Sequence, residues 1–247
     1  MKGLPPFFSA WAMRAATTGS SGGWNGSLSM MTTDSTSPGM STPSQKLWLP
    51  SSTALQRSEA WRLWREGQLK DWSHQPLAHG LLPNTLRRAV VASEDSQFFE
   101  HHGVDWSAMQ AAWAHNQTGT ARVHGGSTIT QQLAKNLFLS GERQLLRKAQ
   151  ELVLTGMLEL VLSKQQILDI YLNQVEWGEG VFGAQAAAQR YFRQHAWTLN
   201  ANQAARLAVM LPSPKRFETH PNSRYLRQRG GVIQQRMQSV DVPRKQP

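Results

Sequence analysis

Two adjacent carboxylates, Glu94 and Asp95, stand at the end of a helix that the apolar pattern predicts over residues 85–93. The helix dipole disfavours negative charge at that end, so their position needs an explanation. A solvated acidic pair is the simplest interpretation and is favoured on local grounds. Phe98 and Phe99 follow closely, however, and aromatic walls disfavour the charged form of a carboxylate, which is how a general acid or base is tuned.

A third carboxylate, Glu151, follows Arg147 and Lys148 at helical spacing, so all three share one face of a predicted helix. Arg143 extends that face by one turn. The simplest interpretation is a surface cluster of ion pairs, each contributing about 0.2–0.5 kcal/mol. The alternative is an anion-binding face that holds one carboxylate among cations.

Residues 125–136 lie between these carboxylates in the chain and combine a glycine pair, hydroxyl side chains and a polar helix face. We expect Ser127 to cap the helix, because its hydroxyl can accept a backbone N–H. A helix N-terminus with hydroxyls and a lysine two turns later suits a phosphate group, although polar helix faces usually only contact solvent. The polar positions after Ser127 are Thr128, Gln131, Gln132, Lys135 and Asn136.

The composition limits the possible functions. The 247 residues have room for one good-sized domain and a tail, and the absence of Cys excludes disulfides and thiolate chemistry. A formal charge of +10 favours an anionic partner such as nucleic acid, a phospholipid surface or a phosphorylated substrate. Ten Trp residues suit a membrane interface, but no apolar run reaches the roughly 18 residues that a membrane span needs.

Other common chemistries lack support in the sequence. There is no G-x-x-x-x-G-K-[ST], G-x-S-x-G or S-x-x-K motif, so neither ATP hydrolysis nor serine acyl transfer is indicated. His101 and His102 are adjacent and have no metal-ligand spacing, which favours hydrogen-bonding or core roles for them.

Helices must position these residues, because we find apolar helical periodicity and no convincing strand alternation. The fold class is therefore all-α. The pattern predicts nine helices, in chain order: 53–68, 85–93, a segment from 106 to a loop at 116–124, a segment from 127 to near 140, 143–162, a segment opening at 163, 183–192, 200–211 and 225–237. Expected caps are Ser52 or Thr53, Asn84, Asp105, Ser127 and a capping box at Ser163 and Gln166.

The chain divides into a tail at 1–46, a domain at 47–240 and a short C-terminal tail at 241–247. The first segment is rich in Ser, Thr, Gly and Met and cannot bury enough surface to fold, so we expect it to be disordered or not authentic coding sequence.

Five blocks, in order, resemble the motifs of the peptidoglycan glycosyltransferases, the glycosyltransferase 51 family. The resemblance covers about 47–237, and the run 176–182 is similar to the monofunctional biosynthetic peptidoglycan transglycosylase branch. The blocks are Glu94-Asp95-x-x-Phe98-x-x-His101-x-Gly103, residues 125–136, Arg147-Lys148-x-x-Glu151, Lys164-x-x-Ile167-Leu168-x-x-Tyr171-Leu172-Asn173, and Gly178-x-Gly180 through Tyr191-Phe192.

The resemblance implies a mostly helical, lysozyme-like, two-lobed domain with a membrane-dipping lobe. It also implies polymerisation of lipid II into β-1,4-linked glycan strands with loss of undecaprenyl diphosphate. By this resemblance Glu94 is the general base that takes the proton of the acceptor hydroxyl. Glu151 lies near the donor diphosphate, where it orients Arg147 and Lys148 or holds a divalent cation, Mg or Mn.

The resemblance also implies a set of substrate-binding residues. Among them, Asp95, Phe98 and His101 would support Glu94, while preorganised cations would stabilise charge on the departing diphosphate. The loop 116–124 would be a mobile segment on the acceptor side. The full set is Asp95, Phe98, His101, Ser127, Thr128, Gln131, Gln132, Lys135, Asn136, Arg143, Arg147 and Lys148.

The implied location is the periplasmic face of the bacterial inner membrane. Partners would be lipid II, the growing glycan strand, an anionic membrane surface and other cell-wall synthesis and division proteins, with no nucleic acid. The branch usually has a transmembrane anchor before the domain, and the tail at 1–46 shows none. Three alternatives stay open: a lytic glycosidase, a non-enzymatic scaffold or pseudoenzyme, and, on charge alone, a nucleic-acid-binding protein.

Overall fold

The computed structural model describes residues 50–69, 72–78, 80–117, 126–139 and 145–243. The expectations for the tail at 1–46 and for Arg143 lie outside these residues. Of the loop expected at 116–124, residues 116 and 117 belong to helix α4 (Trp106–Gln117), and residues 118–124 lie outside the described chain.

Helices dominate the described chain, so the all-α class is confirmed apart from one small sheet. They are α2 (Ala54–Glu66), α3 (Asn84–Glu94), α4 (Trp106–Gln117), α5 (Ile129–Phe138), α6 (Leu145–Val161), α7 (Lys164–Gln174), α8 (Ala184–Phe192), the 3-10 turn η2 (Ala196–Thr198), α9 (Ala201–Met210), α10 (Pro214–Glu218) and α11 (Arg224–Arg236).

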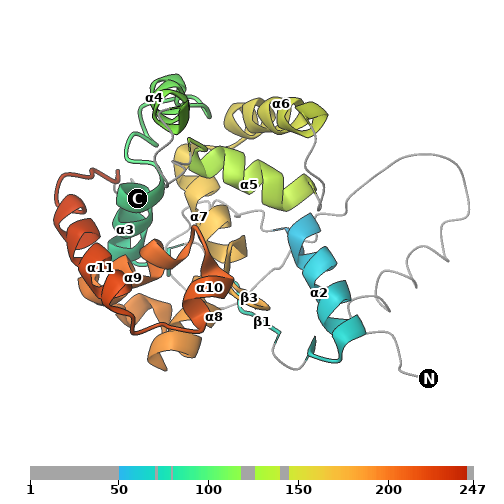
Figure 1. Ribbon diagram of the computed structural model, residues 1–247, viewed down its shortest axis with the longest axis vertical. Coiled ribbons are helices and arrows are strands. Elements are labelled where there is room, and N and C mark those ends of the chain that lie inside the picture. Colours follow the sequence, from blue (N-terminus) through green and yellow to red (C-terminus); the bar gives the residue numbers. More distant parts are fainter. Residues whose placement is uncertain (1–49, 70–71, 79, 118–125, 140–144, 244–247) are drawn as a thin grey trace, which may run out of the picture.

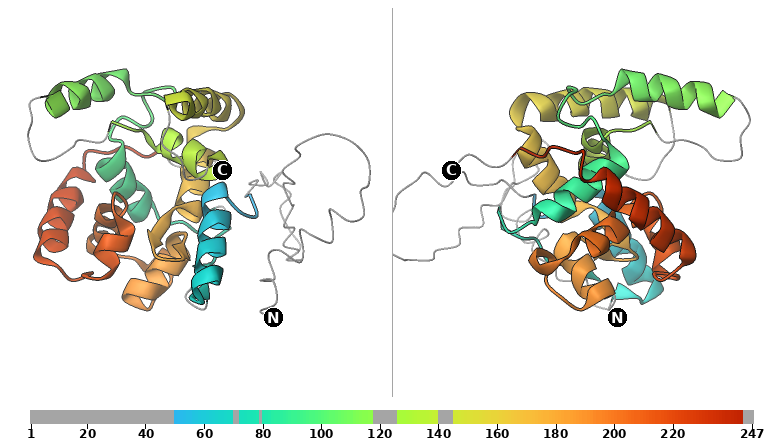
Figure 2. Two further views of the ribbon diagram at one scale, coloured as in Figure 1. Left: turned by 45° about the vertical axis from the view of Figure 1, so that its right-hand side comes forward. Right: turned by 90° about the vertical axis from the view of Figure 1, so that its left-hand side faces the viewer.

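The helices form two groups. Figures 1 and 2 show α4 and α6 together at one end of the molecule, above the remaining helices. In the larger group α3 packs against α9 and α11, and α8 lies beside the sheet. Helix α5 joins the groups, because it packs against α6 on one side and against α7 and α2 on the other.

Helix α7 is the centre of the larger group, since every residue from Ile167 to Gln174 is buried. Its polar residues find partners there: Asp169 accepts from the Arg87 guanidinium at 2.6 Å, and the Asn173 side chain accepts from the Leu77 N–H at 2.7 Å. These paired polar groups, together with the apolar packing, fix the position of the helix.

Local cap chemistry explains where several helices begin. The capping box at Ser163 and Gln166 is present, as predicted, and Thr53 caps α2 with Gln56. Asp105 accepts the Ala108 N–H at 2.8 Å, as expected for a cap. The prediction for Asn84 was wrong, because it is the first residue of α3 and follows Pro83 without any side-chain cap bond.

A three-stranded sheet was not predicted. Its strands are β1 (Ser73–His74), β2 (Glu176–Gly178) and β3 (Val181–Phe182), in the order β1-β3-β2. Strand β3 runs parallel to β1 and antiparallel to β2. Strands of two or three residues are too short to show an alternating pattern, and β2 and β3 are buried throughout.

Candidate active site

Glu94 is the last residue of α3, and a side chain of α5 holds its carboxylate. The Gln132 amide donates from Nε2 to Oε2 of Glu94 at 2.9 Å. The Tyr171 hydroxyl of α7 in turn donates to Oε1 of Gln132 at 2.8 Å. Three helices therefore meet at one half-buried carboxylate, which the sequence placed in a candidate active site.

The environment of Glu94 changes its acidity. Burial raises the pKa of the Glu94 carboxyl, the hydrogen bond from Gln132 works in the opposite direction, and the negative charge of Asp95 adds to the rise. A carboxylate with a raised pKa binds a proton more readily than a solvated one. This is the property that a general base needs near neutral pH.

Asp95 explains why two carboxylates end a helix. Its Oδ2 accepts the Ile129 N–H at 3.0 Å, and the His101 Nε2 lies 2.9 Å from its Oδ1. The buried carboxylate thus sits at the N-terminus of α5, where the helix dipole favours negative charge. This contact connects the end of α3, and with it Glu94, to the start of α5.

The beginning of α5 differs from the prediction. Thr128, not Ser127, is the N-cap: it accepts the Gln131 N–H, and the Gln131 side chain accepts the Thr128 N–H. The Thr128 hydroxyl donates its only proton to the carbonyl oxygen of Gly103 at 2.5 Å. The Thr128 hydroxyl and the backbone N–H groups of Ile129 and Gln131 are therefore already bonded to protein atoms. Ser127, by contrast, is exposed.

The later positions of α5 split between core and surface. Ile129 and Leu133 are fully buried, as their spacing predicted, and Asn136 is also buried. Lys135 is exposed and makes no ion pair with any of the residues that the structure describes. Of the polar residues on this helix, Gln132 contacts Glu94, and Lys135 is the cation that is free to meet a ligand.

Glu151 is buried on α6 and pairs with the Lys148 ammonium, as the helical spacing indicated. Arg147 precedes this pair and is half-buried. No group of three or more side chains suited to a metal ion occurs among the described residues. We therefore derive no step through a metal ion.

Glu159 was missed by the sequence reasoning. The Thr130 hydroxyl of α5 and the Lys164 ammonium both donate to its Oε1, at 2.5 and 2.8 Å. Lys164 also lies 4.5 Å from the centre of the Phe98 ring, which is fully buried and packs in the core. The sequence did contain a signal for this ion pair: Glu159 lies near the end of one predicted helix, and Lys164, five residues later, opens the next. Phe98 acts through packing in this arrangement.

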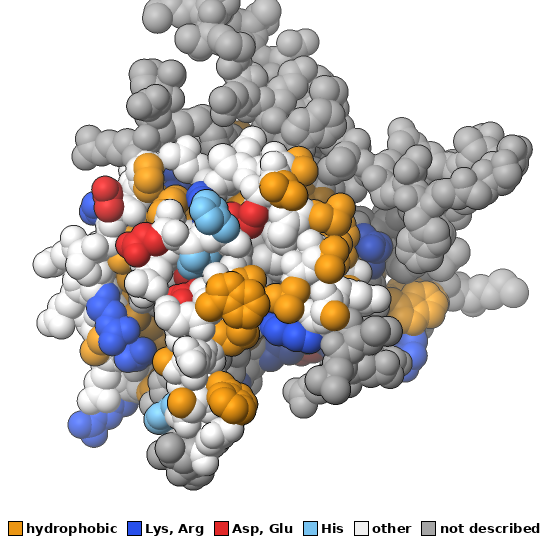
Figure 3. Space-filling model, turned by 90° about the horizontal axis from the view of Figure 1, so that it is seen from above, with side chains coloured by type: hydrophobic (Ala, Val, Ile, Leu, Met, Phe, Trp, Pro, Cys, Tyr) orange, Lys and Arg blue, Asp and Glu red, His pale blue; other side chains and the backbone are white. Residues whose placement is uncertain are grey.

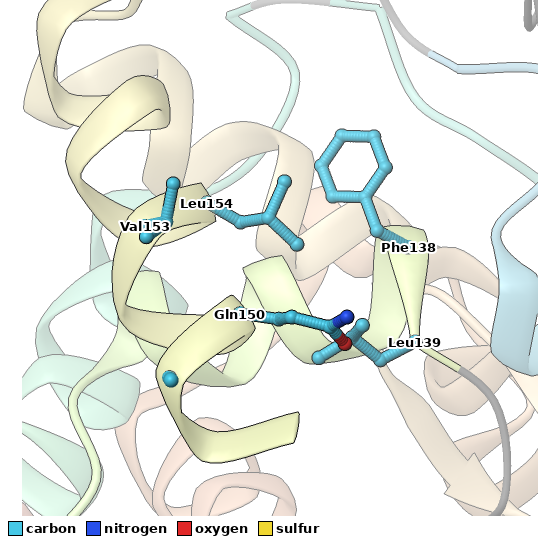
Figure 4. Close-up of a pocket in the computed structure, with 6 residues that line it drawn as sticks. Phe138, Leu139, Gln150, Val153 and Leu154 are labelled. Atoms are coloured by element: carbon cyan, nitrogen blue, oxygen red, sulfur yellow. The ribbon is translucent and has the colours of Figure 1, made fainter. Parts of the chain in front are cut away.

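The end of the molecule that carries α4 and α6 exposes several large apolar side chains among polar and charged ones (Figure 3). Leu160 is 88% exposed and Trp113 is 66% exposed, although both are large and apolar. An open hollow of about 680 Å³ lies between α5 and α6, and Figure 4 shows Gln150 and Leu154 reaching from α6 toward the end of α5. The other lining residues are Phe138, Leu139, Ala149 and Val153.

No helix in the described part of the chain is both long enough and apolar enough to cross a bilayer.

Comparisons with known proteins agree with this geometry. A family model described as Transglycosylase matches residues 65–238. A biosynthetic peptidoglycan transglycosylase of Bordetella avium is 51% identical over 198 residues, covering 78% of this chain and 82% of that protein. One of Burkholderia pseudomallei is 51% identical over 197 residues, covering 80% of this chain and 77% of that protein. The chain belongs to the transglycosylase family, in the branch of the biosynthetic peptidoglycan transglycosylases.

Proposed function

We propose that the chain polymerises lipid II into β-1,4-linked glycan strands and releases undecaprenyl diphosphate. The observation that carries this proposal is the position of Glu94. It is a half-buried carboxylate with a raised pKa, and it is held by the helix that also presents the exposed Lys135. A proton acceptor and a cation on adjoining elements are what transfer of a sugar from a diphosphate requires.

In this reaction Glu94 takes the proton from a hydroxyl of the acceptor sugar. The acceptor oxygen then bonds to the anomeric carbon of the donor, and the bond from that carbon to the diphosphate oxygen breaks. Lys135, Arg147 and Lys148 stabilise the negative charge that the leaving diphosphate develops. Arg143 is assigned to the same group on the resemblance.

The apolar surface of α4 and α6 suits contact with a lipid bilayer. Its exposed side chains include two Trp residues, Trp106 and Trp113, a residue type that favours the boundary between acyl chains and water. The hollow between α5 and α6 begins one turn after Lys135, so an apolar chain lying there would have its diphosphate end near that ammonium. This surface supports action at a membrane, and the family resemblance implies the periplasmic face of the bacterial inner membrane.

The test is polymerisation of labelled lipid II by the purified full chain, with and without Mg²⁺. Glu94→Gln is expected to abolish glycan formation while circular dichroism and the unfolding midpoint stay close to those of the wild type. Full activity of Glu94→Gln would remove Glu94 from the mechanism.

A lytic glycosidase would give a different outcome. It would release fragments from finished peptidoglycan, and Lys135→Ala would be nearly silent, because cleavage of a glycosidic bond needs no cation for a diphosphate. Binding of lipid II without turnover in the wild type would instead favour a scaffold. Steep salt-dependent binding of DNA would favour a nucleic-acid partner.

A further inference from the structure

Tyr171 lies beneath the candidate active site and is too deeply buried to touch a substrate. The side chain is fully buried in α7, and its hydroxyl donates to Oε1 of Gln132 at 2.8 Å. A tyrosine in an apolar interior needs no hydroxyl for packing. The hydroxyl therefore has a polar task, and its partner in the described structure is the side chain that contacts Glu94.

The Gln132 amide could face Glu94 with either end. With its N–H forward it donates to the Glu94 carboxylate, as it does at 2.9 Å. With its oxygen forward, two acceptors would face each other, and Nε2 would point at the Tyr171 hydroxyl instead. A side-chain amide has no intrinsic preference between these orientations, so its neighbours select one. The Glu94 carboxylate favours the first orientation, and a second neighbour on the far side of the amide can reinforce that preference.

Tyr171 is that second neighbour. If the amide turned over, the Tyr171 proton would lose the acceptor that it now has and would be left buried beside an N–H donor. A buried donor without an acceptor is costly. Burial, with the nearby charges of Glu94 and Asp95 adding to it, also raises the pKa of the Tyr171 hydroxyl, so it keeps its proton and stays a donor.

Glu94 depends on this orientation because of its place in the chain. As the last residue of α3 it lies where backbone carbonyls accumulate negative potential. The Gln132 N–H is the one side-chain donor bound to it among the described residues. Its loss would leave the carboxylate both misplaced and less acidic.

We propose that Tyr171 is a positioning residue of the active site, whose buried hydroxyl holds the Gln132 amide with its N–H toward Glu94. This inference rests on the proposed function for its effect on turnover. Its effect on the Glu94 carboxyl does not depend on the reaction, so that carboxyl gives a separate readout.

The experiment follows the carboxyl carbon of Glu94 by NMR in full chain labelled with [5-¹³C]glutamate, with Glu94→Gln identifying the resonance. Tyr171→Phe is expected to move the Glu94 titration to higher pH, by up to about one unit, because complete loss of a hydrogen bond to a charged group shifts its ionisation about tenfold. In the lipid II assay the acid side of the kcat profile should move by the same amount with KM unchanged.

Tyr191→Phe is the matched control. The Tyr191 hydroxyl also donates to a single carbonyl oxygen, that of Trp177 at 2.8 Å, but it lies between α8 and β2. This variant should lose similar stability and leave the Glu94 titration in place. In a Gln132→Met background, Tyr171→Phe should cause no further shift, because the amide through which it acts is gone.

An unchanged Glu94 titration in Tyr171→Phe would overturn the inference. If that variant does not fold, 3-fluorotyrosine at position 171 can replace it, because its hydroxyl is kept and is a stronger donor to Gln132. The Glu94 titration should then move to lower pH, and a titration that does not move would overturn the inference as well. If the wild type makes no glycan but the titration still shifts, the proposed function fails and the positioning role stands.

Discussion

The pH dependence of stability should be dominated by a carboxyl far from the active site. Glu176 lies in β2 and is only 8% exposed. The one ion pair that it makes with described residues is with Lys215 at 3.6 Å, and Glu59, a second carboxylate, pairs with the same ammonium at 2.8 Å. Burial raises the pKa of Glu176 from 4.5 to about 7, with Lys215 opposing the rise and Glu59 adding to it.

The size of the effect follows from these two values. Because the folded state holds its proton more tightly than the unfolded chain, stability is greatest below pH 4.5 and is lost as the pH rises toward 7. Each pH unit between the two values corresponds to about 1.4 kcal/mol. The Glu176 carboxyl therefore removes about 3 kcal/mol of unfolding free energy across this interval, and the loss levels off above it.

The assay is urea unfolding of wild type and Glu176→Gln between pH 4.5 and pH 8.5. The glutamine does not titrate, so the variant should gain about 3 kcal/mol relative to wild type as the pH rises. Glu100→Gln, a substitution of an exposed carboxylate, should stay within about 0.5 kcal/mol of wild type throughout. A constant difference between Glu176→Gln and wild type across the range would refute the reasoning.

Two further predictions concern the fold around the site. Asp95→Asn keeps one acceptor for the Ile129 N–H and loses the carboxylate at the start of α5, so it should cost about 1–3 kcal/mol in urea unfolding; an unchanged midpoint would contradict the anchoring role. Gly183 has φ +84 and a Cβ there would lie 2.6 Å from the Asn173 carbonyl oxygen, so Gly183→Ala should cost about 3 kcal/mol or more. Gly231→Ala, inside α11 with open space around it, should instead stabilise by about 0.5–1 kcal/mol, and equal effects of the two alanines would contradict both assignments.

Helix positions could be predicted because they depend on neighbours in sequence. Apolar spacing and cap residues located α5, α7 and α9 to within a few residues. The cap of α5 was placed one residue early, although the sequence contains the correct signal: Thr128 followed three residues later by Gln131 forms a capping box, whereas Ser127 has no such partner. Of the two glycines within α11, the structure explains Gly230, which packs against Arg206.

The short sheet could not be predicted in the same way. Its strands pair Ser73 with Val181, more than a hundred residues apart, and each is too short to carry a pattern of its own. Such pairing depends on how α7 and α8 bring the segments together, which no local window of sequence contains.

The sequence by itself determined which residue types were available for catalysis: a carboxylate pair after α3, a polar helix ending in lysine, and a third carboxylate among cations. Only the tertiary structure decided their tasks. It divided the adjacent pair into Glu94, which binds Gln132, and Asp95, which binds the start of α5. It also added Tyr171 beneath them. The physical reason is that these hydrogen bonds join residues that are 34 to 39 positions apart in the sequence, so they exist only once α3, α5 and α7 have packed.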